Sequence, residues 1–455
     1  MKRKPRRGAD PFDCQIELAL DPGGFISDRP CYLFVRELED VAAGIAKLTG
    51  TDPVRAAARY EAFLAGCYEK AEELHDSSGS FGQFVGDLIC KWIKAMQASG
   101  ADPDETAARL LAWMDDDPYA LCYDIEKDAS KAFDKAGLVA FERQIRTRFE
   151  AAGTVKPAQG KALGHAPEYL RRHYGGVLRT IYLARQNLAD YIALANRIGI
   201  TVQDCHAVAT MLVTRRKPDE ALAWAERGVA LDRENPHGCT MAGYHLIGLH
   251  RELLTKLGRG NEALEDAWAE FREEPGKYSY AELMKFVPKT GRAAWHEKAM
   301  DAAKGDDLHS LIELFLEVKE MKRLAELVRG ATDQVLEQLS EYSAEPAAKK
   351  LEKAHPDLAA RLWRAQGMRL VNAAKSKSYD AALANFERAR RCYERAGRGA
   401  EWADTVDHIR ANHRRKTGFM PGFEALATGA GRAAEPSFLE RAKTRWGVWH
   451  GKDNS

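Results

Sequence analysis

Apolar and polar positions follow helical spacing in the stretch KPDEALAWAERGVALD, residues 217–232. Pro218 suits the first turn of a helix, and the acidic Asp219 and Glu220 favour its positive end. The apolar side chains that follow share one face: Ala221, Leu222, Ala225 and Val229, with Trp224 and Gly228 at its border. The pattern predicts an amphipathic helix whose small and large apolar residues pack against a neighbouring helix.

A related sequence pattern, which we call the repeat phrase, occurs twice further along the chain. It appears in GRGNEALEDAWAEF, with Ala263, Leu264, Ala267, Trp268 and Phe271 on one face, and in KSYDAALANFERARRCY, with Ala382, Leu383 and Phe386. Leu222 and Leu264 are 42 residues apart, and Leu264 and Leu383 are 119 apart. The second interval predicts three further units of about 40 residues, the period of two-helix repeats. Each such unit buries its apolar stripe against the next one.

Tryptophans occur at helical positions beside small residues throughout the chain. They are Trp92, Trp113, Trp224, Trp268, Trp295, Trp363 and Trp402. A ligand box built from such residues is one interpretation, but tryptophan among alanines is more often used to pack helices together. We therefore predict that Trp224 in particular packs between neighbouring helices and does not form part of a ligand site.

Amphipathic segments separated by short breaks such as ENPHG and REEPGK fill the rest of the chain, and convincing strands are missing. The one extended-looking run, CYLFV at 31–35, follows Ser27 and Pro30, which favour a helix running toward Leu48. We predict an all-α fold, in which an N-terminal helical bundle continues into a TPR-like α-solenoid of antiparallel helix pairs.

Composition along the chain predicts five segments. They are a basic flexible tail at 1–10, an N-terminal helical domain at 11–150, a linker at 151–170, a TPR-like helical-repeat domain at 171–415 and a loosely ordered C-terminal tail at 416–455. Gly, Pro and Ala replace periodic apolar residues in the linker. Within the C-terminal tail we expect FMPGF, residues 419–423, to tuck against the last helix.

The total charge is nearly balanced, with 68 Lys and Arg against 67 Asp and Glu, so no global field attracts nucleic acid or an anionic membrane. The basic start lacks the apolar run of a secretory signal, and no stretch approaches the ~20 apolar residues of a membrane span. We expect a cytoplasmic protein without a membrane partner. The eight cysteines form no CxxC pair, which indicates small buried side chains rather than a disulfide framework.

The best metal candidate in the sequence is HGCTMAGYHLIGLH, which contains His237, Cys239, His245 and His250. Zinc prefers such nitrogen and sulfur ligands. However, His245 and His250 are five residues apart, about 140° around a helix, whereas HExxH places two histidines on one face. This spacing favours a polar helix with a buried cysteine, and we expect no metal and no cofactor.

Two acidic runs, HDSSGS at 75–80 and MDDDPY at 114–119, offer oxygen ligands for a hard cation, but helix capping explains them more simply. Nucleophile and phosphate motifs are absent, including GxSxG, GxxxxGKS and HExxH. We therefore expect no catalytic residues.

Basic residues gather near both ends. They are Lys2, Arg3, Lys4, Arg6 and Arg7 at one end, and His413, Arg414, Arg415 and Lys416 near the other. Such clusters are possible contacts for phosphates or other anions. A solvated tail is the alternative, which the lack of interleaved aromatic residues at the N-terminus favours.

Several longer phrases give the chain a resemblance to known sequences: DPGGFISDR, RYEAFLAGCYEKAEELHDSSGSFGQFVGDL, LADYIALANRIGITVQD, KPDEALAWAERG, LGRGNEALEDAWAEFREEPGKYSYAELMK and YERAGRGAEWADTVDHIRANHRRKTGFMPGFE. The chain resembles an uncharacterised bacterial family of helical-repeat proteins, whose relatives include chains described as SWIM zinc-finger proteins. The resemblance implies an α-solenoid similar to tetratricopeptide arrays and implies no activity. The SWIM signature requires CxC, which this sequence lacks, so its zinc site is not implied.

The repeat phrase and the missing catalytic motifs favour a non-enzymatic scaffold or adaptor that binds a protein or peptide partner. Two alternatives remain open. One is a nucleic-acid-associated adaptor that uses the basic termini. The other is a cryptic metal-dependent enzyme hidden in the helices.

Overall fold

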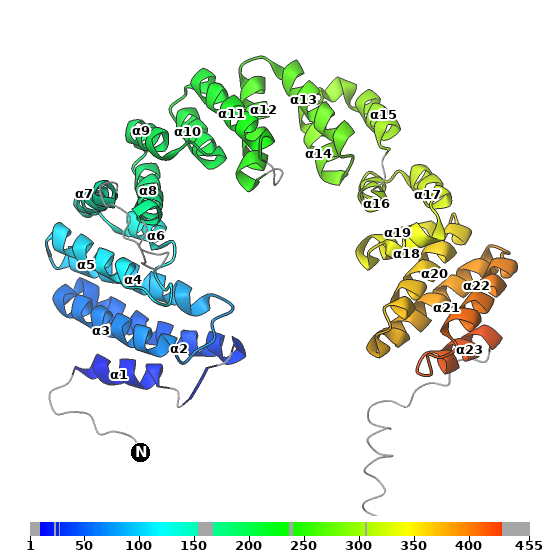
Figure 1. Cartoon of the computed structure of the whole chain (residues 1–455), viewed down its shortest axis with the longest axis horizontal. Helices are drawn as coiled ribbons and strands as arrows, with labels where there is room; N and C mark the ends of the chain where they lie inside the picture. The colour runs from blue at the N-terminus through cyan, green and yellow to red at the C-terminus, as the bar shows by residue number, and fades with distance from the viewer. Residues whose placement is uncertain are drawn as a thin grey trace, which may run out of the picture. The chain divides into compact units, whose positions relative to one another are not determined.

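A computed structural model describes residues 10–21, 24–26, 28–152, 167–235, 240–304 and 307–429. These residues form twenty-three α-helices, and their only β-type pairing is one isolated bridge between Ile26 and Leu74 (Figure 1). The predicted all-α fold is confirmed. CYLFV is helical as expected, since it lies in α2, which runs from Asp28 to Ala46. No helix in the described ranges has the length and apolar character needed to cross a membrane.

Contacts within the chain divide it into two units, residues 1–253 and 254–455, and the division falls inside α12. Unit 1 contains α1 (Pro11–Leu20), α2 (Asp28–Ala46), α3 (Pro53–Ala71), α4 (Ser80–Ala98), α5 (Pro103–Asp115), α6 (Ile125–Ala132), α7 (Lys135–Ala152), α8 (Pro167–Ala184), α9 (Leu188–Ile198), α10 (Val202–Thr214), α11 (Pro218–Arg233) and most of α12 (Met241–Lys256).

Unit 2 begins at Leu254, inside the last turn of α12. It contains α13 (Gly260–Glu273), α14 (Lys277–Phe286), α15 (Arg292–Ala302), α16 (Leu308–Glu317), α17 (Met321–Gly330), α18 (Asp333–Gln338), α19 (Glu341–Leu351), α20 (Pro356–Asn372), α21 (Tyr379–Arg395), α22 (Gly399–His413) and α23 (Met420–Thr428).

Helix starts in unit 1 follow a simple local code of aspartate followed by proline. Three helices begin this way, with Asp10, Asp52 and Asp102 as the capping residues of α1, α3 and α5. Each carboxylate accepts a hydrogen bond from a backbone N–H of the first turn, which would otherwise lack a partner. The following proline has no N–H to satisfy and is already close to helical φ.

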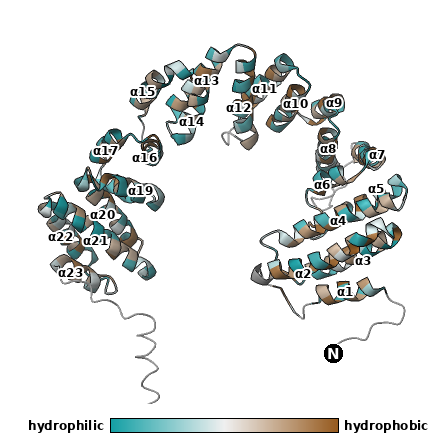
Figure 2. Ribbon diagram, turned by 180° about the vertical axis from the view of Figure 1, so that it is seen from behind, coloured by the Kyte–Doolittle hydropathy of each residue, from teal (hydrophilic) through white to brown (hydrophobic). Residues whose placement is uncertain are grey.

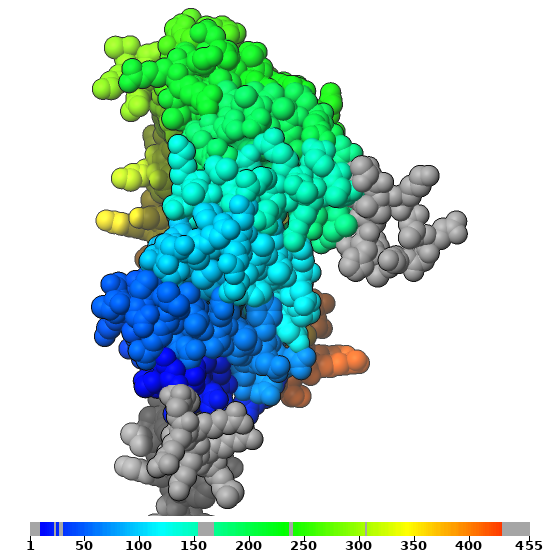
Figure 3. Space-filling view, turned by 90° about the vertical axis from the view of Figure 1, so that its left-hand side faces the viewer, coloured from blue at the N-terminus to red at the C-terminus, as the bar shows by residue number. Residues whose placement is uncertain are grey.

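Helices pack mainly on helices that are near them in the chain. Every extensive helix–helix contact joins elements within three positions of each other in chain order, as in α3 with α4, α10 with α11 and α20 with α21. In the face of unit 1 seen in Figure 3, the colours follow one another in chain order from blue to green. Such local contacts are the property of stacked helical repeats, in which each unit buries its apolar face against its neighbours. Most helices accordingly mix apolar and polar residues along the ribbon in Figure 2.

The repeat phrase forms the buried faces that its pattern predicts. Leu222, Leu264 and Leu383 are each at most 9% exposed, and the alanines next to them are buried. Gly228, at the border of the α11 face, lies where three helices meet. A Cβ there would overlap Leu246 of α12 and lie 2.6 Å from Cys205 Cβ of α10. The glycine therefore permits a close approach of backbones that a larger residue would prevent.

The prediction of three further units between Leu264 and Leu383 is wrong. In the described residues Leu264 lies in α13 and Leu383 lies in α21. The eight helices from α14 to α21 correspond to four helix pairs, whereas three were predicted. The reason is helix length. Helices α14 to α19 have only 6 to 11 residues each, so each pair occupies fewer residues than the 42 that separate Leu222 from Leu264.

The predicted docking of FMPGF is confirmed. Phe419 and Phe423 are fully buried, and the Phe423 ring contacts that of Trp402 in the preceding helix α22. Both rings also contact the ring of Phe386 in α21. The predicted tail at 1–10 and the predicted linker at 151–170 fall mostly outside the described residues. Helices α7 and α8, which flank residues 153–166, pack against each other. The five segment boundaries stay predictions.

Candidate functional site

The four residues of the predicted metal candidate are only partly described. His237 and Cys239 lie outside the described residues. His245 is exposed on α12, where its ring lies 6.0 Å from that of His206, and His250 is half-buried on the same helix. No group of three potential ligands in the described part of the chain includes either histidine. The expectation that these four residues bind no metal therefore stays a prediction.

The basic residues near the C-terminal end have two different environments. Arg414 and Arg415 are exposed directly after α22. Lys416 is half-buried, and its Nζ donates a hydrogen bond of 2.8 Å to the carbonyl of Val371 near the end of α20. Lys416 thus has a structural partner, whereas the two arginines face solvent. Lys2, Arg3, Lys4, Arg6 and Arg7 all lie outside the described residues.

The first acidic run caps a helix, as predicted, whereas Asp117 of the second run holds the turn before α6. Asp76 accepts hydrogen bonds from the backbone N–H groups of Phe81 and Gly82 at 2.9 and 3.0 Å, in the first turn of α4. Asp117 accepts from the N–H groups of Leu121 and Cys122. Both carboxylates satisfy backbone groups that have no partner within a helix.

Large exposed tyrosines mark the first turns of two helices in unit 2, α14 and α19. Tyr278 is the second residue of α14 and 74% exposed, and Tyr342 is the second residue of α19 and 80% exposed. His309 holds the same position in α16, which contacts both of the other helices. We refer to Lys277, Tyr278, His309, Glu313 and Tyr342 as the tyrosine edge.

Polar contacts join these helix starts into one surface. Lys277 Nζ of α14 lies 2.9 Å from a Glu313 oxygen of α16, and Glu313 lies 3.6 Å from His309 Nε2. His309 Nδ1 in turn lies 3.0 Å from Ser343 Oγ of α19. Because Ser343 Oγ already donates to the carbonyl of Ser340, it accepts from His309, which fixes the proton on Nδ1. The contact with Glu313 raises the pKa of Lys277, so this ammonium stays charged.

Unit 1 repeats the same feature. The first turns of α8 and α12 carry Tyr169 and Tyr244, which are 54% and 58% exposed, and α10 carries His206 near its start. Across both units these aromatic positions are 169, 206, 244, 278, 309 and 342, between 31 and 38 residues apart. Sequence reasoning missed this spacing because it followed buried positions, and the signal was an aromatic residue near the starts of α8, α10, α12, α14, α16 and α19.

The environment of His206 gives a pH-dependent prediction. Burial, and next the neighbouring His245, lower the pKa of His206 from its ordinary value of 6.5. Because the folded-state pKa is lower than the unfolded one, the stability from neutral His206 is present above about pH 6.5 and is lost as the pH falls through the folded pKa. An NMR titration should show His206 titrating below 6.5. In the His245→Ala variant the midpoint should move upward, and an unchanged midpoint would show that His245 has no influence.

A pocket of about 320 Å³ lies between α3 and α5 in unit 1, lined by Glu61, Leu64, Ala65, Tyr68, Arg109, Ala112 and Trp113. Arg109 and Glu61 form an ion pair within this lining. Tyr68 Oη lies 3.2 Å from the Cys122 thiol, whose pKa burial raises to about 11. Burial also raises the pKa of Tyr68. Both groups stay protonated at neutral pH, so this neighbourhood contains no activated thiolate.

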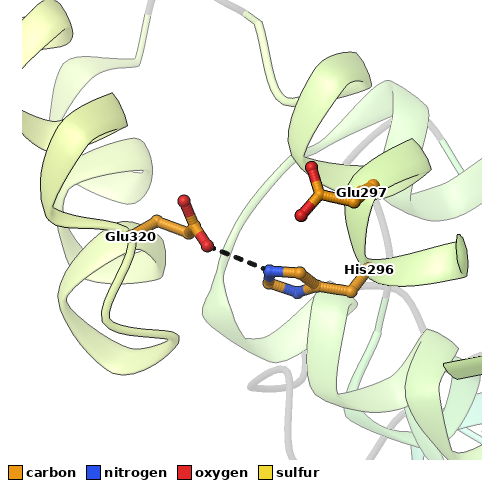
Figure 4. A group of neighbouring side chains, drawn as sticks. All are labelled: His296, Glu297 and Glu320. Atoms are coloured by element: carbon orange, nitrogen blue, oxygen red, sulfur yellow. Dashed lines mark hydrogen bonds and ion pairs between the residues drawn. The ribbon is translucent and has the colours of Figure 1, made fainter. Parts of the chain in front are cut away.

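One group of potential metal ligands occurs in the described part of the chain, and it lies in unit 2 (Figure 4). His296 and Glu297 belong to α15, and Glu320 is the residue immediately before α17. One ligand atom from each lies within 4.8 Å of the others, and His296 Nε2 is 3.2 Å from Glu320 Oε1. His296 and Glu320 are half-buried, and Glu297 is exposed.

Two neighbours support this group from outside. Tyr280 Oη of α14 lies 2.7 Å from His296 Nδ1. Arg323 Nη2 lies 3.2 Å from Glu297 Oε2 and 2.9 Å from Asp301 Oδ1, and Arg323 Nε lies 3.7 Å from Glu320 Oε2. Burial, and next the charge of Glu320, raise the pKa of Tyr280. The sequence contained no signal for the group, since 23 residues separate Glu297 from Glu320 without any ligand motif.

Comparisons with known proteins identify a family but no activity. The family of unknown function DUF6880 matches residues 23–421. A solved structure described as a circular tandem repeat protein with novel repeat topology and enhanced subunit contact surfaces is 12% identical, with 92% of this chain and 98% of that chain covered and a TM-score of 0.19. Because this TM-score is so low, the description of the fold is based on the helices of this chain alone. No curated protein matches the chain.

Proposed function

The chain belongs to the family of unknown function DUF6880, and from that premise we propose that it is a non-enzymatic scaffold that binds a protein or peptide partner. The tyrosine edge of unit 2 is the proposed contact surface. The observation that carries the proposal is the exposure of Tyr278 and Tyr342, each the second residue of its helix, α14 or α19.

Tyrosine suits such a surface for a physical reason. Its ring offers a large rigid contact area with little side-chain entropy to lose, and its hydroxyl keeps the free surface compatible with water. Tyrosine is accordingly enriched among the residues that dominate binding energy at protein interfaces. A structural role does not account for Tyr278 and Tyr342, because the core of unit 2 is completed by other side chains and leaves both rings outside.

The edge offers more than two isolated rings. The ion pair of Lys277 with Glu313 and the hydrogen bond of His309 to Ser343 hold the three helix starts together. A partner would therefore meet a surface that is already organised, which reduces the entropy lost on binding. The Lys277 ammonium also lies 4.8 Å from the centre of the Tyr278 ring and restricts its movement.

Removal of the two rings tests the proposal. Peptides selected by display against the whole chain should bind the Tyr278→Ala/Tyr342→Ala variant much more weakly than the unaltered protein. We expect each ring to contribute about 2 kcal/mol, or about 30-fold in Kd, because tyrosines of this kind act as hot spots. Fluorescence anisotropy of labelled peptides measures the change, and circular dichroism checks that the helices persist.

Tyr123→Ala is the matched control. Tyr123 is 81% exposed but lies in the turn before α6, outside the tyrosine edge. Its removal should leave peptide affinity unchanged. Selected peptides that bind the double variant as tightly as the unaltered protein would reject the edge as the contact surface, and a selection that yields no binding peptide would reject peptide binding.

A further inference from the structure

We propose that His296, Glu297 and Glu320 bind a divalent transition-metal ion of the zinc class, which joins α15 to α17 within unit 2. The ligands come from two helices on either side of α16 in the chain, so a bound ion would act as a cross-link in the helical array. This inference concerns a site separate from the tyrosine edge and does not depend on the proposed partner.

The separation of the ligand atoms fits a small tetrahedral ion. Zinc binds histidine nitrogen and carboxylate oxygen at about 2.0 Å, which places neighbouring ligands about 3.3 Å apart in a tetrahedron. The His296 Nε2 to Glu320 Oε1 distance is 3.2 Å. Glu297 points its carboxylate toward the same space in Figure 4, within 4.8 Å of both. A small rotation of this exposed side chain completes three ligands, and water takes the fourth position.

The outer partners suit metal binding as well. Histidine ligands commonly use the second ring nitrogen in a hydrogen bond that fixes the ring, and Tyr280 Oη at 2.7 Å from Nδ1 provides it. With a metal on Nε2, the proton moves to Nδ1 and is donated to the Tyr280 oxygen. Arg323 contacts Oε2 of both glutamates, which leaves the Oε1 atoms for the ion.

Local charge also favours a divalent cation. Arg323 is surrounded by three carboxylates, those of Glu297, Asp301 and Glu320, and offsets only one of their charges. The nearby Lys298 ammonium lies over the rings of Trp268 and Trp295, 3.9 Å from the centre of the latter. The Arg292 guanidinium also acts on nearby Tyr280, and the remaining carboxylate charge attracts a divalent ion. An imidazole ligand selects zinc-class ions over magnesium or calcium, which prefer oxygen.

Zinc titration with mutants tests the inference. An ion that binds the folded state but not the unfolded state stabilises the protein by RT ln(1 + [L]/Kd), so Tm rises with the free-ion concentration. We expect Zn²⁺, but not Mg²⁺, to raise the Tm of the unaltered chain. His296→Ala and Glu320→Gln should abolish the increase, and Tyr280→Phe should weaken zinc affinity about 10-fold or more in isothermal titration calorimetry, because it removes the outer hydrogen bond.

His408→Ala is the control, because it removes an exposed histidine from α22 of the same unit and should leave the zinc response intact. Cobalt provides a second measurement on the unaltered chain, since Co²⁺ in a tetrahedral site absorbs in the visible range. If His296→Ala does not fold, the loss of this absorption in Glu320→Gln decides. A zinc response that is missing from the unaltered chain, or that persists in both ligand variants, would overturn the site.

Discussion

Replacement of Trp363 by alanine is expected to lower the free energy of unfolding by about 3 to 5 kcal/mol, the usual cost of removing a large aromatic side chain from a core. Trp363 lies in α20 and is 1% exposed. Its Nε1 donates to Glu352 at 2.9 Å, and the Arg388 guanidinium of α21 lies 4.5 Å from the ring centre. The truncated side chain would leave a cavity and an unpaired acceptor between these helices.

Trp224→Ala is the matched control for Trp363→Ala. Trp224 is half-buried on α11 and is covered by Arg227, whose guanidinium lies 5.1 Å from the ring centre. It buries less area, so we expect a loss of about 1 kcal/mol. Urea denaturation followed by circular dichroism measures both variants. Equal losses would contradict the assignment of Trp363 to the core and of Trp224 to a half-buried position.

Replacement of Asp204 by alanine should destabilise unit 1 by a similar amount, about 3 to 5 kcal/mol, because it removes one partner of a buried ion pair. Asp204 is 1% exposed. Its carboxylate accepts from Arg179 at 2.6 Å, from the Tyr191 hydroxyl at 2.8 Å and from both the N–H and the hydroxyl of Thr201. Without it, the Tyr191 hydroxyl would be left inside the protein without an acceptor, and the partly buried Arg179 would lose its carboxylate partner.

Glu150→Ala provides the comparison for Asp204→Ala. Glu150 also pairs with an arginine, Arg197, through two hydrogen bonds of 2.7 and 2.8 Å, but both side chains are about half exposed. An exposed pair contributes about 1 kcal/mol or less. Denaturation curves should therefore separate the two variants clearly. A loss for Asp204→Ala no greater than that for Glu150→Ala would mean that its donors find other partners or water.

Local sequence signals account for many helix starts and buried faces. Aspartate before proline started α1, α3 and α5, and the alanine-flanked leucines marked buried faces, because capping and periodicity depend only on residues within a few turns. The length of each repeat was harder to predict. The same apolar pattern fits helices of 6 residues and of 17, and only the contacts of each helix decide where it ends.

The candidate sites show the same division. A tyrosine after a helix start is visible in the sequence, but the sequence pattern does not show whether a neighbouring helix covers the ring. The exposure of Tyr278 and Tyr342 therefore depends on the helices that pack beside α14 and α19. His296 and Glu320 belong to different helices, and only their tertiary packing brings them to 3.2 Å.

The amino-acid sequence by itself determined that this protein is helical, where many of its helices begin and which faces they bury, because these properties follow from hydrogen bonds and periodicity within each segment. Only the tertiary structure decided which polar and aromatic side chains stay exposed and which meet across helices. Those outcomes depend on distances between segments that are remote in the chain.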